Sequence, residues 1–407
     1  MNITLRLAWR NLWRQPRRTW LTTGAMVFSN ALLVFMMSLQ FGMYDLMIDN
    51  TLKAVSGHMQ VQAPGYVDDQ KMRQAVSGIV PLADRLRAEI PEASIAARSQ
   101  AFVLASSEER SYGIALYGVE PTFEPDVSSL AGLVKDGRFF EDTYAPEIVI
   151  GSTLARNLRV AVGDELTILG SGRDGSFAAG VVEIAGIFDS GVPDLDRTIA
   201  EIPIGLFDDV FYMNGAGHQI VINAPVIDEA PAILERARSL VSDDVVVHDW
   251  DRLQPGLRQA IQADISSAFF MYGVLVILVA FSVLNTQLMS VLERTHEFGI
   301  VMALGLKPGR LGRLVLLETA LMGLMGGIIG AIVGAIVTGY FTVNGLYIPG
   351  MDEMAVKFNL PPRMYPQISL LSLSAGPAIV LAFSILAALY PAVRLNWMRP
   401  VDAMRAV

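Results

Sequence analysis

Long apolar runs alternate with polar stretches along the chain, and the longest runs can cross a bilayer. They cover about residues 20–43, 265–292, 314–341 and 370–393. Each has the twenty or so predominantly apolar residues that the hydrocarbon core of a membrane requires. The pattern therefore predicts a membrane protein with four transmembrane α-helices.

Residues 44–264, between the first two spans, have the pattern of a globular domain. Short apolar strands such as 112–119 and 219–222 are separated by Gly, Pro and Asp, and a helix is predicted from 228 to 240. Between about 125 and 215 short strands dominate, which predicts a β-rich insert. The expected fold class is thus four transmembrane helices with a large α/β plus β domain inserted between the first and the second.

Charge is distributed unevenly over the polar segments. Twelve Lys and Arg but only three Asp and Glu occur in residues 1–19, 293–313 and 394–407 taken together. Residues 44–264 contain 17 Lys and Arg but 34 Asp and Glu, and the loop 342–369 has equal numbers of the two kinds. Because short segments rich in Lys and Arg stay cytoplasmic, we expect both termini and 293–313 inside and the acidic domain outside. Without a eukaryotic targeting feature, we expect a multi-pass protein of the bacterial inner membrane, with the domain in the periplasm.

The opening residues are basic and amphipathic. Arg6, Arg10 and Arg14 are four residues apart, and Trp9 and Trp13 lie between them. Such a helix is typical of segments that rest on an anionic cytoplasmic leaflet. A nucleic-acid partner is not expected, because an apolar span follows directly.

Composition and motifs argue against chemistry carried by this chain. Of 407 residues 52% are hydrophobic and 17% charged, and there is no cysteine. The GxGxxG run at 170–175 precedes another strand, which predicts a hairpin turn and not a dinucleotide site. His296-Glu297 lacks the second histidine of a zinc-protease motif, and pairs such as Asp68-Asp69 are expected to be solvated. We therefore expect no catalytic, cofactor-binding or metal-binding residues.

The stretch 291–318 carries too many charges to lie in lipid. Thr295 is the predicted N-cap of a short helix that ends at Leu304, Gly305 supplies a left-handed stop, and Pro308 opens the next helix.

Within this short helix Phe298, Val301 and Met302 form one apolar stripe. Two explanations remain open for the stripe: the helix lies on lipid headgroups, or another surface covers it.

The same stretch resembles the signature of the MacB, LolC/LolE and FtsX permeases, the type VII ABC transporters. The matching positions are Glu293, Arg294, Glu297, Phe298, Gly299, Ile300, Ala303, Leu304, Gly305 and Glu318. Two further runs strengthen the resemblance: residues 8–25, and Tyr390-Pro391-Ala392 followed by Pro400-Val401 and Ala403-Met404-Arg405. Leu306 departs from the small or polar residue that the family often has after the glycine.

The resemblance implies that this chain and the ATP-hydrolysing part of the transporter are separate subunits. The short helix would be a coupling helix that docks on a separate cytoplasmic ABC ATPase dimer, and ATP and Mg would be bound by that partner, since this sequence has no GxxxxGK[ST] motif. Further implied partners are a second permease subunit, identical or homologous, membrane lipid, and a periplasmic carrier or adaptor. Residues 44–264 would be a porter-like domain with a sabre-like insert.

Three functions are compatible with the resemblance. The opening residues and the run 56–66 look closer to the lipoprotein-releasing LolC/LolE branch than to MacB efflux pumps, which implies extraction of lipoproteins from the outer leaflet of the inner membrane. The alternatives are MacB-like efflux of a small molecule or peptide, and FtsX-like regulation of a cell-wall hydrolase.

If lipoproteins are the substrate, flexible apolar residues at the outer ends of the first two spans would form the acyl-chain groove. These residues are Met36, Leu39, Met43, Phe269 and Phe270. Ordinary packing against lipid or other helices explains them equally well. The glycines at 323, 326, 327, 330 and 334 predict close helix packing, within the bundle or between two copies.

Overall fold

A computed structural model describes residues 3–347, 349–350 and 363–398, so the closing motif predicted at 400–405 lies outside the described residues. The chain forms two compact units. The helical unit comprises residues 1–44, 261–347 and 363–407, and the domain unit comprises residues 45–260 and 348–362.

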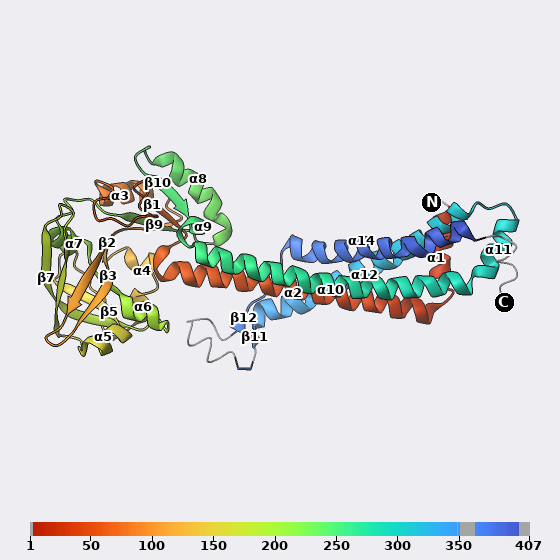
Figure 1. Ribbon diagram of the computed structural model, residues 1–407, viewed down its shortest axis with the longest axis horizontal. Coiled ribbons are helices and arrows are strands. Elements are labelled where there is room, and N and C mark those ends of the chain that lie inside the picture. The colour runs from red at the N-terminus through yellow and green to blue at the C-terminus, as the bar shows by residue number, and fades with distance from the viewer. Residues whose placement is uncertain (1–2, 348, 351–362, 399–407) are drawn as a thin grey trace. The chain divides into compact units, whose positions relative to one another are not determined.

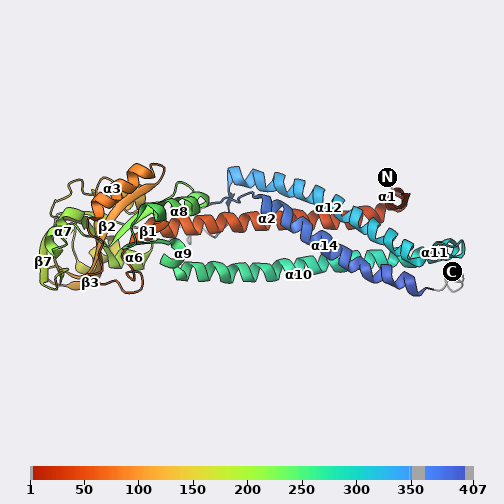
Figure 2. The ribbon, with the colours of Figure 1, turned by 90° about the horizontal axis from the view of Figure 1, so that it is seen from above.

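Within these described residues four helices are long and apolar enough to cross a membrane, which confirms the four predicted apolar helices. They are α2 (Pro16–Thr51), α10 (Pro255–Glu293), α12 (Pro308–Asn344) and α14 (Leu370–Arg394). Figures 1 and 2 show them side by side within the helical unit. All four extend beyond the apolar runs. Shorter elements of this unit are α1 (Ile3–Leu12), α11 (Thr295–Ala303) and the small hairpin of β11 (Leu346–Tyr347) and β12 (Arg363–Met364).

Glycines let α12 approach α2 closely. A Cβ atom at Gly330 would lie 2.5 Å from the Cβ of Asn30, and one at Gly334 would lie 2.9 Å from the Cβ of Val34. No side chain fits at such distances, so these positions require glycine. The predicted close packing is thus found within the chain itself.

The domain unit is built on one ten-stranded sheet. Its strand order is β10-β1-β9-β2-β3-β8-β5-β7-β4, and β6 pairs with both β2 and β7. The elements are β1 (Met59–Gln62), α3 (Ile79–Glu89), β2 (Ser94–Ser106), β3 (Ser111–Val119), α4 (Glu124–Val127), β4 (Val134–Gly137), β5 (Glu147–Gly151), α5 (Ser152–Leu158), β6 (Glu165–Ser171), β7 (Phe177–Phe188), α6 (Pro193–Thr198), β8 (Ile199–Pro203), α7 (Ile204–Phe211), β9 (Gln219–Asn223), α8 (Ala230–Leu240), β10 (Val246–Asp249) and α9 (Trp250–Leu253).

Six of the strands close a ring, because β2, β3, β8, β5, β7 and β6 pair in succession and β6 returns to β2. One apolar core fills this ring, and a second lies where α3 and α8 cover β1, β9 and β10. Strand β2 belongs to both parts, since its first residues pair with β9 and its last with β6. The predicted insert is therefore continuous with the rest of the sheet and also contains α5, α6 and α7. The GxGxxG run is the β6–β7 turn, as predicted.

A buried ion pair anchors the start of the domain unit. Arg98 on β2 donates from Nε to Glu124 at 3.0 Å and also hydrogen-bonds the carbonyl of Val55, in the π-helical turn Leu52–Ser56. Glu201 on β8 is buried nearby, and its Oε2 has no partner among the described residues. Burial, and secondarily the negative charge of Glu124, raise the pKa of Glu201 to about 8.

This raised pKa predicts a pH dependence of domain stability. Below pH 8 Glu201 stays protonated in the folded state, whereas the unfolded chain, with an ordinary pKa of about 4.3, loses this proton. Stability therefore falls as pH rises from about 4.3 and levels off above the folded pKa of about 8. Glu201→Gln removes this loss. Between pH 6 and pH 9 the wild type should lose roughly 2–3 kcal/mol relative to the variant, measured by denaturant unfolding. A difference that does not change with pH would contradict the buried, protonated state.

Candidate functional site

Helix α11 lies between α10 and α12 and has the limits that the sequence predicts, within one residue. Thr295 is its first helical residue and not the predicted N-cap, because its hydroxyl donates back to the carbonyl of Val291 at 3.0 Å. The helix ends at Ala303, Gly305 has a φ of +95°, and α12 starts at Pro308. The predicted sequence of helix, stop and new helix is confirmed.

The apolar stripe of α11 is covered by the chain itself. Phe298 and Met302 are buried against Leu311 and Val315 of α12 and against Leu395, just after α14. This packing answers the question that the sequence left open. The stripe fixes α11 to the bundle and is not the surface available to a lipid or a partner.

The outer side of α11 exposes a different apolar set. Ile300 is 44% and Leu304 83% exposed, and Ala303 beside them is exposed as well. Positions three and four apart share one face of a helix. This face, and not the Phe298 stripe, is therefore the part of the predicted coupling segment that can contact another protein.

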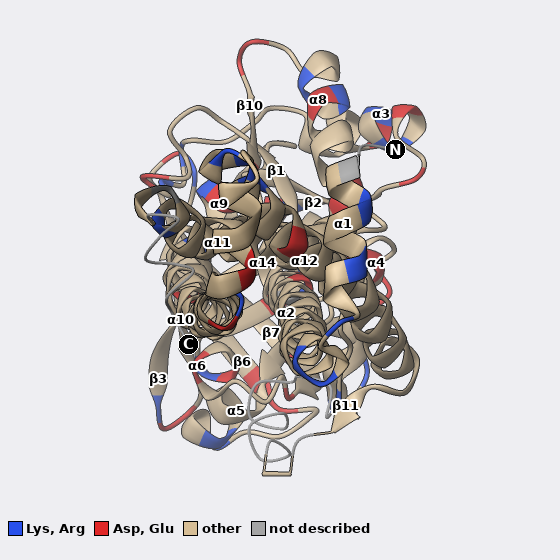
Figure 3. Cartoon of the chain, turned by 90° about the vertical axis from the view of Figure 1, so that its right-hand side faces the viewer, with Lys and Arg blue, Asp and Glu red and all other residues tan. Residues whose placement is uncertain are grey.

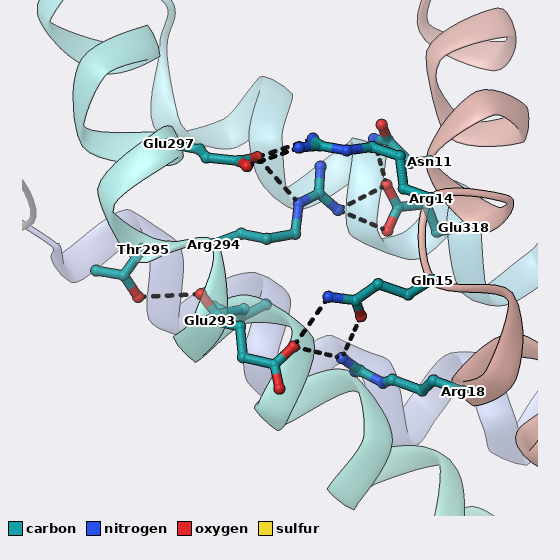
Figure 4. Close-up of polar contacts among 10 residues, drawn as sticks. Asn11, Arg14, Gln15, Arg18, Glu293, Arg294, Thr295, Glu297 and Glu318 are labelled. Carbon is teal, nitrogen blue, oxygen red and sulfur yellow. Dashed lines mark hydrogen bonds and ion pairs between the residues drawn. The ribbon is translucent and has the colours of Figure 1, made fainter. Parts of the chain in front are cut away.

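Ion pairs connect α11 to the opening segment of the chain (Figure 4). Arg14, in the turn between α1 and α2, donates to both oxygens of Glu297, from Nη1 at 3.0 Å and from Nη2 at 2.9 Å. Arg294 lies on the other side of Glu297, with 3.6 Å between Nε and Oε2. Hydrogen bonds from Arg14 lower the pKa of Glu297, so this contact holds at neutral pH and is lost only as pH falls through that lowered value.

A second carboxylate, Glu318 of α12, anchors the same group of residues. Its side chain is 6% exposed and accepts from Nη1 of Arg294 at 3.2 and 3.3 Å and from the amide of Asn11 at 2.7 Å. Because a buried charge is costly without partners, these bonds are what allow a carboxylate at this depth.

Glu293 at the end of α10 completes the group by accepting from Arg18 at 3.2 Å and from Gln15 at 3.3 Å. We call this group the latch, and its members are Asn11, Arg14, Gln15, Arg18, Glu293, Arg294, Glu297 and Glu318.

Half of the latch was not predicted from the sequence. Its local patterns predict no role for Asn11, Gln15 and Arg18, and they place Arg14 in a membrane-facing row with Arg6 and Arg10. The signal that could have found them is complementary charge: residues 1–19 contain five Arg and no acid, whereas the α11 segment contains Glu293 and Glu297. Which cation pairs with which acid depends on the fold and cannot be read from spacing.

A polar cavity of about 220 Å³ lies beside the latch. Besides latch residues it is lined by Leu12, Thr19, Thr286, Gln287, Ser290 and Met322. Gln287 is 2% exposed, and its Oε1 has no partner among the described residues. A cavity of this size and polarity has room for several water molecules.

An apolar cavity of about 180 Å³ lies between α2, α10 and α14. Its lining is Leu33, Met37, Phe269, Tyr272, Gly273, Val276, Ile277, Gly376, Ile379 and Phe383. Of the predicted groove residues only Phe269 is among them. Met36, Leu39 and Met43 are half-buried elsewhere on α2, and Phe270 is exposed.

Polar side chains join α2 and α10 at one end of this apolar cavity. Tyr272, which lines the cavity, donates to Gln40 at 2.8 Å, and Tyr44 donates to Asp264 at 2.6 Å. Gln40 also donates to Asp264 at 3.0 Å. This bridge fixes the spacing of the two helices whose outer ends the sequence singled out. Within the described residues no cluster of three metal-ligating side chains occurs.

If the latch holds α11, reversing the charge of Arg14 alone should loosen this helix, and reversing the charges of both Arg14 and Glu297 should be tolerated. Arg14→Glu places two carboxylates together and should loosen α11, whereas Arg14→Glu combined with Glu297→Arg restores an opposite pair. Hydrogen exchange of residues 295–303 in the full-length protein should rise in the single variant and return towards wild type in the double. Because exposed pairs contribute only about 0.2–1 kcal/mol, a change of up to about fivefold is expected. Equal hydrogen exchange in all three proteins would show that Arg14 does not hold α11 in place.

Both parts of this architecture match families of known proteins. Residues 19–240 match the MacB-like periplasmic core domain, and residues 269–400 match the FtsX-like permease C-terminal family. The lipoprotein-releasing system transmembrane protein LolC of Xylella fastidiosa (strain Temecula1) is 25% identical over 317 residues, which cover 73% of this chain and 74% of that protein. LolC of Neisseria meningitidis is 24% identical over 56% of each chain.

Solved structures resemble the domain unit only loosely. The extracellular domain of the noncanonic ABC-type transporter YknZ from Gram-positive bacteria has a TM-score of 0.36 and 16% identity, and covers 47% of this chain and 99% of that one. The periplasmic region of MacB from Actinobacillus actinomycetemcomitans has a TM-score of 0.37 and 14% identity, and covers 52% and 96%.

The two family matches cover both units of the chain, and the periplasmic core match alone extends over more than half of its length. The four apolar helices and these relatives make it a multi-pass protein of the inner membrane. The chain therefore belongs to the FtsX-like and MacB-like family of type VII ABC transporter permeases.

Proposed function

We propose that this permease transmits ATP-driven motion of a cytoplasmic ABC ATPase dimer to its external domain, and that it thereby extracts lipoproteins from the outer leaflet of the inner membrane. A second permease subunit, identical or homologous, would complete the complex. ATP and Mg²⁺ would be held by the ATPase, since this sequence carries no phosphate-binding loop motif.

The exposed face of α11 supports the coupling part of this proposal. Ile300, Ala303 and Leu304 form a small apolar surface that the described residues leave uncovered, although the opposite side of the same helix is buried. Apolar residues exposed together beside charged ones are typical of protein contact sites. Because ABC transporter permeases generally work with ATPase subunits, the ATPase is the partner that we expect at this surface.

The latch offers a route by which movement of α11 reaches the long helices. Glu297 links α11 to the turn before α2, Glu318 links α12 to α1, and Glu293 links α10 to the first turn of α2. Helices α2 and α10 each continue without interruption from the helical unit into the domain unit. A force on α11 therefore acts on the two helices that are covalently joined to the external domain.

The apolar cavity is the observation that supports a lipoprotein as the substrate. A cavity of about 180 Å³ lined almost wholly by apolar side chains suits hydrocarbon, since an apolar cavity of about 150 Å³ is known to hold benzene. It accommodates a segment of an acyl chain, and the hydroxyl in its lining, that of Tyr272, already donates to Gln40. The LolC relatives carry lipoprotein release in their names, which agrees with an acylated substrate.

Orientation follows from the charge asymmetry: α11 and both termini would be cytoplasmic and the acidic domain periplasmic. The absence of cysteine permits a direct test with single cysteines at two exposed positions. In intact spheroplasts Glu108→Cys should react with an impermeant thiol reagent, and Lys307→Cys should react only after lysis. The opposite pattern would refute this orientation.

Substrate capture tests the lipoprotein proposal. A photo-crosslinking residue at Phe269, which lines the cavity, should capture a triacylated lipoprotein, and ATP supplied with an acceptor should reduce the capture. The neighbouring position Phe270 is the matched control, because both side chains are largely exposed, at 66% and 77%, but Phe270 does not line the cavity and should capture mainly bulk phospholipid. Phospholipid adducts alone at both positions, together with a soluble compound bound to the external domain, would favour efflux instead.

A further inference from the structure

The outer side of α1 carries a groove that the proposed transport cycle does not use. It has a volume of about 650 Å³ and is lined by Leu7, Trp9, Arg10, Asn11, Trp13 and Arg14. The opposite side of α1 packs into the bundle, where Ala8 and Leu12 are buried. The groove thus remains open although its helix is held in place.

The chemistry of this groove is that of a phospholipid headgroup site. Trp9 and Trp13 are both exposed, and their rings meet edge to face with centroids 6.0 Å apart. Indole rings favour the boundary between headgroups and acyl chains, and guanidinium groups bind phosphate. The groove therefore combines an apolar wall with two cations, Arg10 and Arg14.

The charges around the groove select an anionic lipid. Arg6, Arg10 and Arg17 are exposed, and none of them forms an ion pair in the described part of the chain. The first 44 residues contain no Asp or Glu. Figure 3 shows basic bands along α1. A headgroup with net negative charge is thus attracted here, whereas a zwitterionic one gains little.

Arg14 belongs to both the groove and the latch. A guanidinium has five N–H donors, and Arg14 uses one on Nη1 and one on Nη2 for Glu297. Its other donors have no partner among the described residues, so one guanidinium can bind a phosphate and Glu297 together. We propose that the α1 groove binds an anionic phospholipid of the cytoplasmic leaflet and that this lipid, through Arg14, holds α11 in position.

The evidence for the lipid site is the groove itself. The regulatory effect of the bound lipid, however, rests on the proposed coupling role of α11. Because binding at two sites that share one residue is reciprocal, a lipid that favours the present position of Arg14 also favours its contact with Glu297. The permease would then couple best in a membrane with an anionic inner leaflet.

Native mass spectrometry of the full-length permease with equal amounts of phosphatidylglycerol and phosphatidylcholine tests the site. Arg10→Gln should lower the ratio of phosphatidylglycerol to phosphatidylcholine adducts about fivefold, the contribution of one basic residue at an anionic surface. Arg17→Gln removes the same charge outside the groove and should leave the ratio near that of the wild type. Equal loss in both variants would mean general surface charge, and displacement by inorganic phosphate would mean a free-phosphate site. Either result would overturn the proposal.

A nitroxide at Ala303→Cys tests the link to α11, and it involves neither the ATPase nor a lipoprotein. In nanodiscs the label should be less mobile with phosphatidylglycerol than with phosphatidylcholine alone. Glu297→Gln should abolish this difference while phosphatidylglycerol adducts persist. If the difference survives in Glu297→Gln, Arg14 does not connect lipid and helix, even if the transport function is correct.

Discussion

The carboxylate of Glu318 is the constraint around which the helical unit is organised. It is almost fully buried, and without Arg294 and Asn11 it would be an unpaired charge, which costs several kcal/mol. Those two partners come from the segments before α11 and before α2, so satisfying one charge fixes three parts of the chain together. Arg294 in turn faces Glu297, and Glu297 binds Arg14. Polar contacts thus join Asn11, Glu318, Arg294, Glu297 and Arg14 into one connected set, and Glu293 with Gln15 and Arg18 forms a second set beside it.

The remainder of the helical unit combines one tightly packed helix contact with one apolar cavity. Glycines such as Gly330 and Gly334 bring α12 against α2 without space for side chains between them, which gives a stiff contact. Between α2, α10 and α14, by contrast, the packing leaves an apolar cavity, crossed at one end by the bond from Tyr272 to Gln40. Close packing against α12 and the cavity lined by Leu33 and Met37 thus lie on neighbouring faces of α2, which suits the proposed role of this helix in transmitting motion beside a substrate.

Much of this organisation could be predicted from the sequence, because it depends on local pattern. Apolar length predicts the four spans, and Gly305 and Pro308 predict the limits of α11. The β6–β7 turn is also predicted, because a strand follows its glycines. Long-range pairing could not be predicted: the closure of six strands into a ring depends on β6 meeting β2. Likewise, the packing of Phe298 against Leu395 and the bond between Arg14 and Glu297 join residues far apart in the chain. The Phe298 stripe was therefore recognised, but the surface that covers it was not.

We propose that α11 controls the position of the domain unit. Spin labels at two exposed positions, Glu108→Cys in the domain unit and Val343→Cys in the helical unit, measure the movement within one chain by pulsed EPR. In the complete complex in lipid nanodiscs, ATP should shift this distance. Gly305→Val forces a β-branched residue into positive φ and misplaces α11, so it should abolish the shift although the ATPase stays bound. An unchanged ATP-dependent shift in Gly305→Val would contradict the account.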